Sequence, residues 1–336
     1  MSGPSFDHLV ALSSNVGLFE HAEFVAPRRE HGYCTDDVAR LLVVVAREPT
    51  PTRAVRDLGR MALAFLADAQ GVDGKIRNRR TADGRWHGPR TVEDCWGRSI
   101  WAFGTAASHA PEAWMRQSAA AHFDHGAQQR SPWPRSMAFA ALGAAEMLAA
   151  DPSHHRARLM LLDAAATIGS PSQEPDWLWP EPRLTYANAA LADALIVAGN
   201  VLGRSDTVGD GLAMLRWLLR RETIDAHYSP TPVGGSDRGD SAPAFDQQPI
   251  EAAAMADACH HAYAVTGDGE WMNGLDVAIR WFAGDNDAGA QMWDPATGGG
   301  YDGLHASGPN LNQGAESTLA LVSTLQHAHK LTMAGL

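Results

Sequence analysis

Cysteine is scarce in this chain, and the three cysteines are widely separated. Cys34, Cys95 and Cys259 form no CxxC pair, and their number is odd. This pattern argues against a disulfide framework and fits a reducing compartment. The N-terminal residues also lack the basic segment followed by an apolar segment that marks a secretory signal. No apolar run reaches the roughly 18 uninterrupted residues that span a bilayer. We therefore expect a cytoplasmic protein.

Positively charged residues are also fewer than negatively charged ones. The chain has 27 Lys and Arg residues against 39 Asp and Glu residues, which gives a formal net charge of −12. Nucleic acids and anionic membranes are bound through clusters of Lys and Arg, so neither is an expected partner. Five arginines nevertheless fall within residues 77–90. They form either a solvated basic loop or a contact for an anionic group.

Ala- and Leu-rich segments of helical periodicity dominate the sequence, and they alternate between two kinds. One kind is apolar nearly all round, which is typical of buried helices, and the other carries charges on one face. The inner segments are Asp36–Arg47, Asp94–Ser108, Ser136–Ala150, Thr185–Val201, Pro249–Thr266 and Ala315–Thr332. The outer segments are Thr52–Ala69, Pro111–Gln128, Ser153–Ile168, Thr207–Arg221 and Gly269–Ala283, with a short opening helix at Phe6–Leu12.

The connections between these segments differ in length. Those from inner to outer segments are short, as at Glu48–Pro51, whereas most of those from outer to inner segments are long, as at residues 221–248 and 285–314. Long loops in a compact domain are usually functional or disordered, and these contain Trp, Tyr and Gly, which favours order. The pattern predicts an all-α fold, a single domain over residues 1–336. We expect an (α/α)6 toroid of about six helical hairpins with long loops at one end.

The loops that precede the inner segments are rich in acids, amides and aromatic residues. If these loops gather at one end of a ring, they build one deep polar pocket. Four acids stand at or near the starts of inner segments: Asp36, Asp94, Asp246 and Glu316. A carboxylate at a helix start is often only a cap or a complement to the helix dipole. Asp94 and Arg98, four residues apart, either form a local ion pair or face the ring centre.

Amides add to the polar character of the later loops. Gln247 and Gln248 lie between Asp246 and Glu251, and Asn312 and Gln313 precede Glu316. Amides both donate and accept hydrogen bonds, which suits sugar hydroxyls. The structural alternatives are an N-cap by Asp246 and a capping arrangement of Asn310 with Gln313.

Six motifs together carry a family resemblance. They are HGYCTDD (31–37), EDCWGR (93–98), WLWPEPRLTYANA (177–189), FDQQPIEA (245–252), YDGL (301–304) and NQGAEST (312–318). The sequence resembles the six-hairpin glycosidase superfamily. More narrowly, it resembles a glycosidase-like domain of bacterial carbohydrate loci that is sometimes attached to glycosyltransferases. The resemblance implies an (α/α)6 barrel, an active-site cleft at the N-termini of the inner helices, and carboxylates as acid and base.

The leading hypothesis is a glycoside hydrolase that acts on an oligosaccharide or glycoside and needs no metal or cofactor. Such an enzyme uses a protonated carboxylic acid and a second carboxylate as base or nucleophile. We expect the pair to come from Asp36, Asp94, Asp246 and Glu316. The expected substrate contacts are His31, Asp37, Trp96, Arg98, Trp179, Asn188, Gln247, Gln248, Glu251, Asp302, His305, Asn312 and Gln313.

Two alternatives keep the same barrel. A polysaccharide lyase or a sugar epimerase would use proton carriers such as His31, His305 or the arginines of residues 77–90. A non-catalytic sugar-binding domain would bind ligand without forming product, and its acids would lie too far apart to act together.

Overall fold

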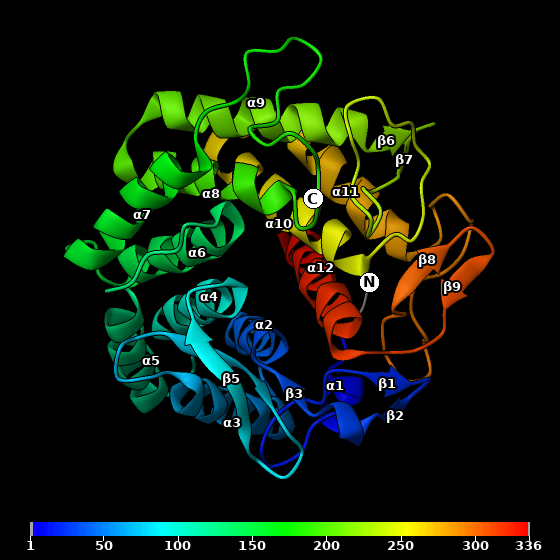
Figure 1. The fold of residues 1–336 in the computed structure, drawn as a ribbon. Coiled ribbons are helices and arrows are strands. Elements are labelled where there is room, and N and C mark those ends of the chain that lie inside the picture. Colours follow the sequence, from blue (N-terminus) through cyan, green and yellow to red (C-terminus); the bar gives the residue numbers. More distant parts are fainter. Residues whose placement is uncertain (1–2, 335–336) are drawn as a thin grey trace.

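Twelve α-helices alternate between an inner and an outer ring in the computed structural model, which describes residues 3–334 (Figure 1). The inner helices are α2 (Thr35–Ala46), α4 (Asp94–His109), α6 (Pro134–Ala150), α8 (Ala189–Leu202), α10 (Pro249–Thr266) and α12 (Ala315–Ala334). The outer helices are α1 (Asp7–Ala11), α3 (Arg53–Ala69), α5 (Ala113–Gly126), α7 (His155–Ile168), α9 (Ser205–Arg221) and α11 (Gly269–Phe282).

The inner helices form a closed ring. Each contacts the next along the chain, and α12 contacts both α10 and α2, so the first and last inner helices are neighbours. Each inner helix from α2 to α10 also packs against the outer helix that follows it, while α1 packs against α12. The predicted all-α toroid of six hairpins is therefore confirmed.

Short strands lie in the loops that lead into inner helices. They are β1 (Ala22–Glu23), β2 (Ala26–Pro27), β3 (Tyr33–Cys34), β4 (Ile76–Arg80), β5 (Trp86–Thr91), β6 (Thr223–Ile224), β7 (His227–Tyr228), β8 (Gly303–His305) and β9 (Gly308–Asn310), with a 3-10 turn at Arg29–His31. Strands β3, β4 and β5 form an antiparallel sheet, and the others pair as two-stranded hairpins. These hairpins stiffen the loop end of the ring.

Helices α4 and α6 approach closely because glycines face their shared seam. A Cβ atom on Gly104 would lie 2.0 Å from the carbonyl oxygen of Gly143, and one on Gly97 would lie 2.2 Å from that of Ser136. Such contacts are too short for any side chain, so both positions require glycine. The seam fixes the distance between the two helices whose first turns help to build the site.

One helix start differs from the sequence-based expectation. Helix α8 begins at Ala189 rather than at Thr185, because the preceding residues form a turn in which Ala187 has a φ of 44°. The side chain of Asn188 accepts a hydrogen bond from the Thr185 N–H at 3.0 Å and stabilises that turn. Among the described residues, we find no helix with the combined length and apolarity needed to cross a membrane.

Candidate functional site

A polar cavity of about 450 Å³ lies where the inner helices begin. This volume falls within the range of about 300–1,000 Å³ that is typical of small-molecule sites. The predicted site residues that line it are Asp36, Asp37, Arg98, Gln248, Glu251, Asp302 and Glu316. They come from α2, α4, α10, α12 and the loops before the last two. Residues far apart in the sequence therefore meet around one cavity.

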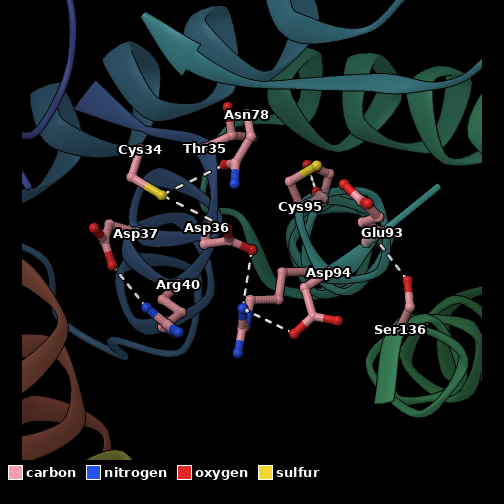
Figure 2. Close-up of polar contacts among 12 residues, drawn as sticks. Cys34, Thr35, Asp36, Asp37, Arg40, Asn78, Glu93, Asp94, Cys95 and Ser136 are labelled. Atoms are coloured by element: carbon pink, nitrogen blue, oxygen red, sulfur yellow. Dashed lines mark hydrogen bonds and ion pairs between the residues drawn. The ribbon is translucent and has the colours of Figure 1, made fainter. Parts of the chain in front are cut away.

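Arg98 of α4 joins two of the predicted acids. One nitrogen of its guanidinium lies 2.9 Å from an oxygen of Asp36 and 3.4 Å from an oxygen of Asp94 (Figure 2). The two oxygens are therefore at most about 6.3 Å apart. The Arg98 side chain is only 6% exposed, and its guanidinium lies over the ring of Phe139 at 4.3 Å. The Tyr186 hydroxyl donates to Asp94 at 2.7 Å. Asp94 and Arg98 thus form the local ion pair, and Arg98 also lines the cavity.

Arg40 likewise joins two acids, on the opposite side of α2. It donates to Asp37 at 2.7 Å (Figure 2). It also lies 2.6 Å from Glu316 of α12. The Asp37 side chain is 5% exposed and the Glu316 side chain 43% exposed. Neighbouring inner helices are thus linked across the cavity by carboxylate–guanidinium pairs, which fix the directions of these carboxylates.

Asp36 and Asp37 are adjacent in the chain, but their pKa values are shifted in opposite directions. Burial alone would raise the pKa of Asp36, but the guanidinium groups of Arg98 and Arg40 outweigh it and hold that pKa below its ordinary value. Burial raises the pKa of Asp37, with support from the negative charges of Glu316 and Glu20, and Arg40 offsets only part of the increase. The cavity therefore contains two adjacent carboxyl groups whose surroundings favour opposite protonation states.

Glu20, Cys34 and Asp37 form the one group with metal-binding atoms that we find in the described part of the chain. Their candidate ligand atoms lie within 4.8 Å of one another. Glu20 is paired with Arg79 and Asp37 with Arg40, so these carboxylates already have cationic partners. Burial raises the pKa of the Cys34 thiol well above its usual range, which keeps it neutral. Two of the three side chains are thus already bonded to guanidinium groups.

A second cavity of about 560 Å³ adjoins the first. Asp36, Arg98, Thr185 and Tyr186 line both cavities and form the wall between them. Asp94 lies on the side of the second cavity. The predicted acids are thus divided between two adjoining cavities, and Asp36 lines both.

Asp246 and His305 lie together, but they line neither cavity. The Asp246 carboxylate is 3.8 Å from the His305 ring, and that histidine side chain is 49% exposed. Burial raises the pKa of Asp246. The loop that carries Asp246 pairs with β8 through the backbone of Gln247 and Leu304. This pair is separate from the acids of α2, α4 and α12.

Several predicted substrate contacts are enclosed by protein. Trp96 and Trp179 are 0% and 1% exposed, and their indoles donate to the carbonyl of Gly126 and the carboxylate of Glu181. Neither ring has an open face for a sugar. The amides of Asn188, Gln247 and Gln313 are likewise buried and bonded to protein groups. In this structure these five side chains contact other parts of the protein and do not line the cavity.

The remaining predicted contacts lie at the rim or support it. His31 packs edge-on against His21, which lines the cavity. The Asn312 side chain accepts the backbone N–H of Phe24 at 2.9 Å. Asp302 lines the cavity but accepts hydrogen bonds from the Gly314 N–H and the Ser317 hydroxyl, both at 2.7 Å.

Glu251 also lines the cavity while holding a loop. Its carboxylate accepts the backbone N–H groups of Ala187 and Asn188 at 2.5 Å and 3.3 Å. Burial, with help from nearby Glu222, raises the pKa of Glu251 to about 8. Glu251 therefore positions the turn that carries Tyr186, which forms part of the wall between the cavities.

The lining residues that were not among the sequence candidates include Glu20, His21, Arg40 and Tyr186. Arg40 follows Asp36 and Asp37 by four and three residues, so helical spacing alone could have indicated it. Tyr186 lies inside the quoted motif of residues 177–189. Glu20 and His21 precede the first motif, and no sequence pattern marks them.

The arginines of residues 77–90 form the β4–β5 hairpin, and their charges are largely matched. Arg79 lines the cavity and pairs with Glu20. Arg80 pairs with Asp68 and lies over the Trp86 ring, and Arg85 pairs with Asp83. These three guanidinium groups thus have carboxylate partners within the protein, and the hairpin presents no open cationic patch built from them.

Solved structures share this architecture over nearly the whole chain. A sugar epimerase from a ruminal bacterium has 10% identity and a TM-score of 0.72, with 96% of this chain and 95% of that chain covered. Cellobiose 2-epimerase from Bacillus thermoamylovorans has 9% identity and a TM-score of 0.71, with 96% of both chains covered. A GH76 α-mannanase from Bacteroides thetaiotaomicron has 10% identity and a TM-score of 0.64, with 96% and 92% covered.

At this level of identity the likeness establishes the fold, which is the (α/α)6 barrel. No protein-family model matches the chain, and no curated protein matches it.

Proposed function

We propose that this protein is a carbohydrate-active enzyme that hydrolyses glycosides in the cavity at the inner-helix N-termini. The observation that carries the proposal is the pair Asp36 and Asp37, two carboxyl groups in one polar cavity whose surroundings drive their pKa values apart. Two carboxyl groups held in opposite protonation states are what an acid and its partner base require. In this proposal Asp37, first expected to be a substrate contact, takes the role of the acid.

The contacts of Cys34 set an upper limit on the separation of the pair, and this limit is compatible with the chemistry. The Cys34 sulfur lies 3.5 Å from Asp36 and within 4.8 Å of Asp37, so the two carboxylates approach to within about 8.3 Å. Glycosidases of both stereochemical classes have their carboxyl groups about 5–9.5 Å apart. Asp37 donates its proton to the glycosidic oxygen as the C–O bond breaks. Asp36 either takes a proton from the attacking water or attacks the anomeric carbon itself.

The other cavity residues suit a sugar. Arg40 and Arg98 hold the carboxylates in place, and Gln248 and Asp302 present polar atoms for hydroxyl groups. Several solved structures with this fold are of sugar-converting proteins, among them cellobiose 2-epimerase and an α-mannanase. These likenesses support a carbohydrate as the substrate class.

A sugar epimerase is the second candidate. His31 and His305, the proton carriers first expected for this reaction, do not line the cavity, but His21 does. The first structural neighbours are also epimerases. An epimerase would invert one carbon of a reducing sugar without cleaving a glycosidic bond, so its product differs in kind from that of a hydrolase.

The test is product analysis with matched variants. The protein is incubated with a panel of reducing disaccharides and nitrophenyl glycosides, and products are followed by NMR. We expect hydrolysis, with about 10²–10⁴-fold loss in both Asp36→Asn and Asp37→Asn. Asp57→Asn, on the exposed face of α3, serves as the control and should retain activity. The configuration of the first product assigns Asp36 as base or nucleophile.

Undiminished hydrolysis in both site variants would overturn the assignment. An epimerised sugar with no cleavage would instead favour the second candidate.

A further inference from the structure

The second cavity has the makeup of a sugar subsite. It is similar in size to the first, at about 560 Å³, and the two share Asp36, Arg98, Thr185 and Tyr186. Its lining includes two aromatic rings, Trp133 and Tyr186, together with polar side chains on the elements around them. Aromatic faces with a few fixed polar groups are the usual composition of a small-molecule site.

Tyr186 is held rigidly as part of this wall. Its hydroxyl donates to Asp94 at 2.7 Å, and the guanidinium of Arg135 lies 5.0 Å from its ring centre. Arg135 also donates to the backbone carbonyl of Tyr186 and to both carboxylate oxygens of Glu181. Ala187, which follows Tyr186, has a φ of 44°, a conformation that non-glycine residues adopt only when their surroundings enforce it. The ring is 43% exposed, so a ligand can contact it. The contacts above hold it in one orientation.

Trp133 provides the second ring. It stands directly before α6 and is 57% exposed, although it borders a cavity. Tryptophan is a large apolar side chain with one polar atom, which suits contact with a ligand that has both apolar faces and hydroxyls.

The polar groups of this cavity are acceptors and donors of the kind that bind hydroxyls. Asn78, Glu93 and Glu181 line it, and the Arg135 guanidinium, whose side chain is 7% exposed, anchors its floor. The cationic groups Arg98 and Arg135 are already paired with carboxylates. A ring-shaped ligand with several hydroxyls and no charge fits this composition.

We propose that the second cavity is a sugar-binding subsite and that the ligand is at least a disaccharide, with one ring in each cavity. Its glycosidic bond then lies at the shared wall, beside Asp36 and Tyr186. This proposal extends the proposed function. Only the cleavage of the glycosidic bond, and not the binding of two sugar rings, depends on that function. Trp133 would be the residue that makes the protein prefer a disaccharide to a monosaccharide.

The experiment measures binding separately from turnover. Cellobiose, maltose and α-1,6-mannobiose are titrated against the Asp37→Asn protein by calorimetry, with glucose and mannose alongside. We expect one disaccharide to bind more tightly than its monosaccharide. Adding Trp133→Ala should weaken that disaccharide about tenfold, which corresponds to about 1.4 kcal/mol, and leave the monosaccharide unchanged. Trp133→Phe, which keeps an aromatic face, should recover most of the affinity.

Trp114→Ala is the matched control. Trp114 is 51% exposed on α5 and borders neither cavity, so its replacement should change neither affinity. The subsite proposal is overturned if no disaccharide of the panel binds more tightly than its monosaccharide. It is also overturned if Trp133→Ala has no effect or weakens both sugars equally. Disaccharide binding that depends on Trp133, together with no hydrolysis by the wild-type protein, supports the subsite and contradicts the proposed hydrolase. Hydrolysis that is unaffected by Trp133→Ala supports the hydrolase and contradicts the subsite.

Discussion

Removing the charge of Arg98 is the sharpest test of how the cavity is stabilised. Its side chain is 6% exposed and contacts Asp36 at 2.9 Å and Asp94 at 3.4 Å. Arg98→Met keeps much of the apolar stem but leaves two neighbouring carboxylates without that cation. Breaking a buried ion pair by removing one partner costs about 3–5 kcal/mol. Because the Asp94 side chain is 20% exposed, we expect the lower end, about 3 kcal/mol of unfolding free energy at pH 7.

The loss should depend on pH in a defined direction. Burial alone raises the pKa of Asp36, and Arg98 is the largest of the charges that lower it. In the wild type the ionised Asp36 therefore contributes stability above its unfolded pKa, which is lost as the pH falls through the lower folded pKa. In Arg98→Met burial raises that pKa, so the variant is penalised near pH 7 and relieved in acid. The difference in unfolding free energy should shrink steadily as the pH falls from 7 to about 4.

Urea unfolding followed by tryptophan fluorescence at pH 4, 5.5 and 7 measures these differences. Arg53→Met is the control, since Arg53 is 92% exposed and lies 3.9 Å from Asp57 on the surface of α3. Exposed pairs contribute about 0–1 kcal/mol, so this variant should resemble the wild type at every pH. An Arg98→Met loss of equal size at all three values would mean that packing, rather than charge, is what Arg98 provides, and it would refute the reasoning.

Two further outcomes test the scaffold. Burial raises the pKa of Glu251 from 4.5 to about 8, so the wild type should lose up to about 5 kcal/mol of stability relative to Glu251→Gln as the pH rises through that window. Urea titrations at pH 5 and 8 measure this, and a difference between the two proteins that stays constant with pH would contradict it. Gly104→Ala should abolish folding or lower the melting temperature sharply, because its Cβ would lie 2.0 Å from the Gly143 carbonyl oxygen. Gly269→Ala has open space and should melt like the wild type; equal melting of both alanine variants would show that the α4–α6 seam can relax.

Helix positions were largely predictable because their signal is local. The apolar periodicity of each segment places α2 and α10 within a residue or two of their observed ends. The start of α8 was not predictable in this way. Its first predicted turn, Thr185–Asn188, is instead held as a loop by Glu251 and Arg135, which are distant in sequence. Tertiary contacts overrode local propensity at that point.

The convergence of the acids could be predicted from the ring of helices, but the residues with which they pair could not. Once inner helices alternate with outer ones, the first turns must meet at one end, as those bearing Asp36 and Glu316 do. The direction of a side chain depends on packing that a sequence pattern does not contain. Trp96 and Trp179 therefore lie in motifs that contribute residues near the cavities, but their own rings are enclosed by protein. Tyr186 and Arg40, from equally local patterns, face the cavity.

The contact of α12 with α2 ties the formation of the site to the order of synthesis. The guanidinium of Arg40 reaches Glu316, so two residues separated by most of the chain complete one wall of the cavity. A nascent chain on the ribosome that lacks α12 would hold the acidic pair of α2 with that wall open to water. The cavity should accordingly take its complete form only after α12 has docked into the gap between α2 and α10.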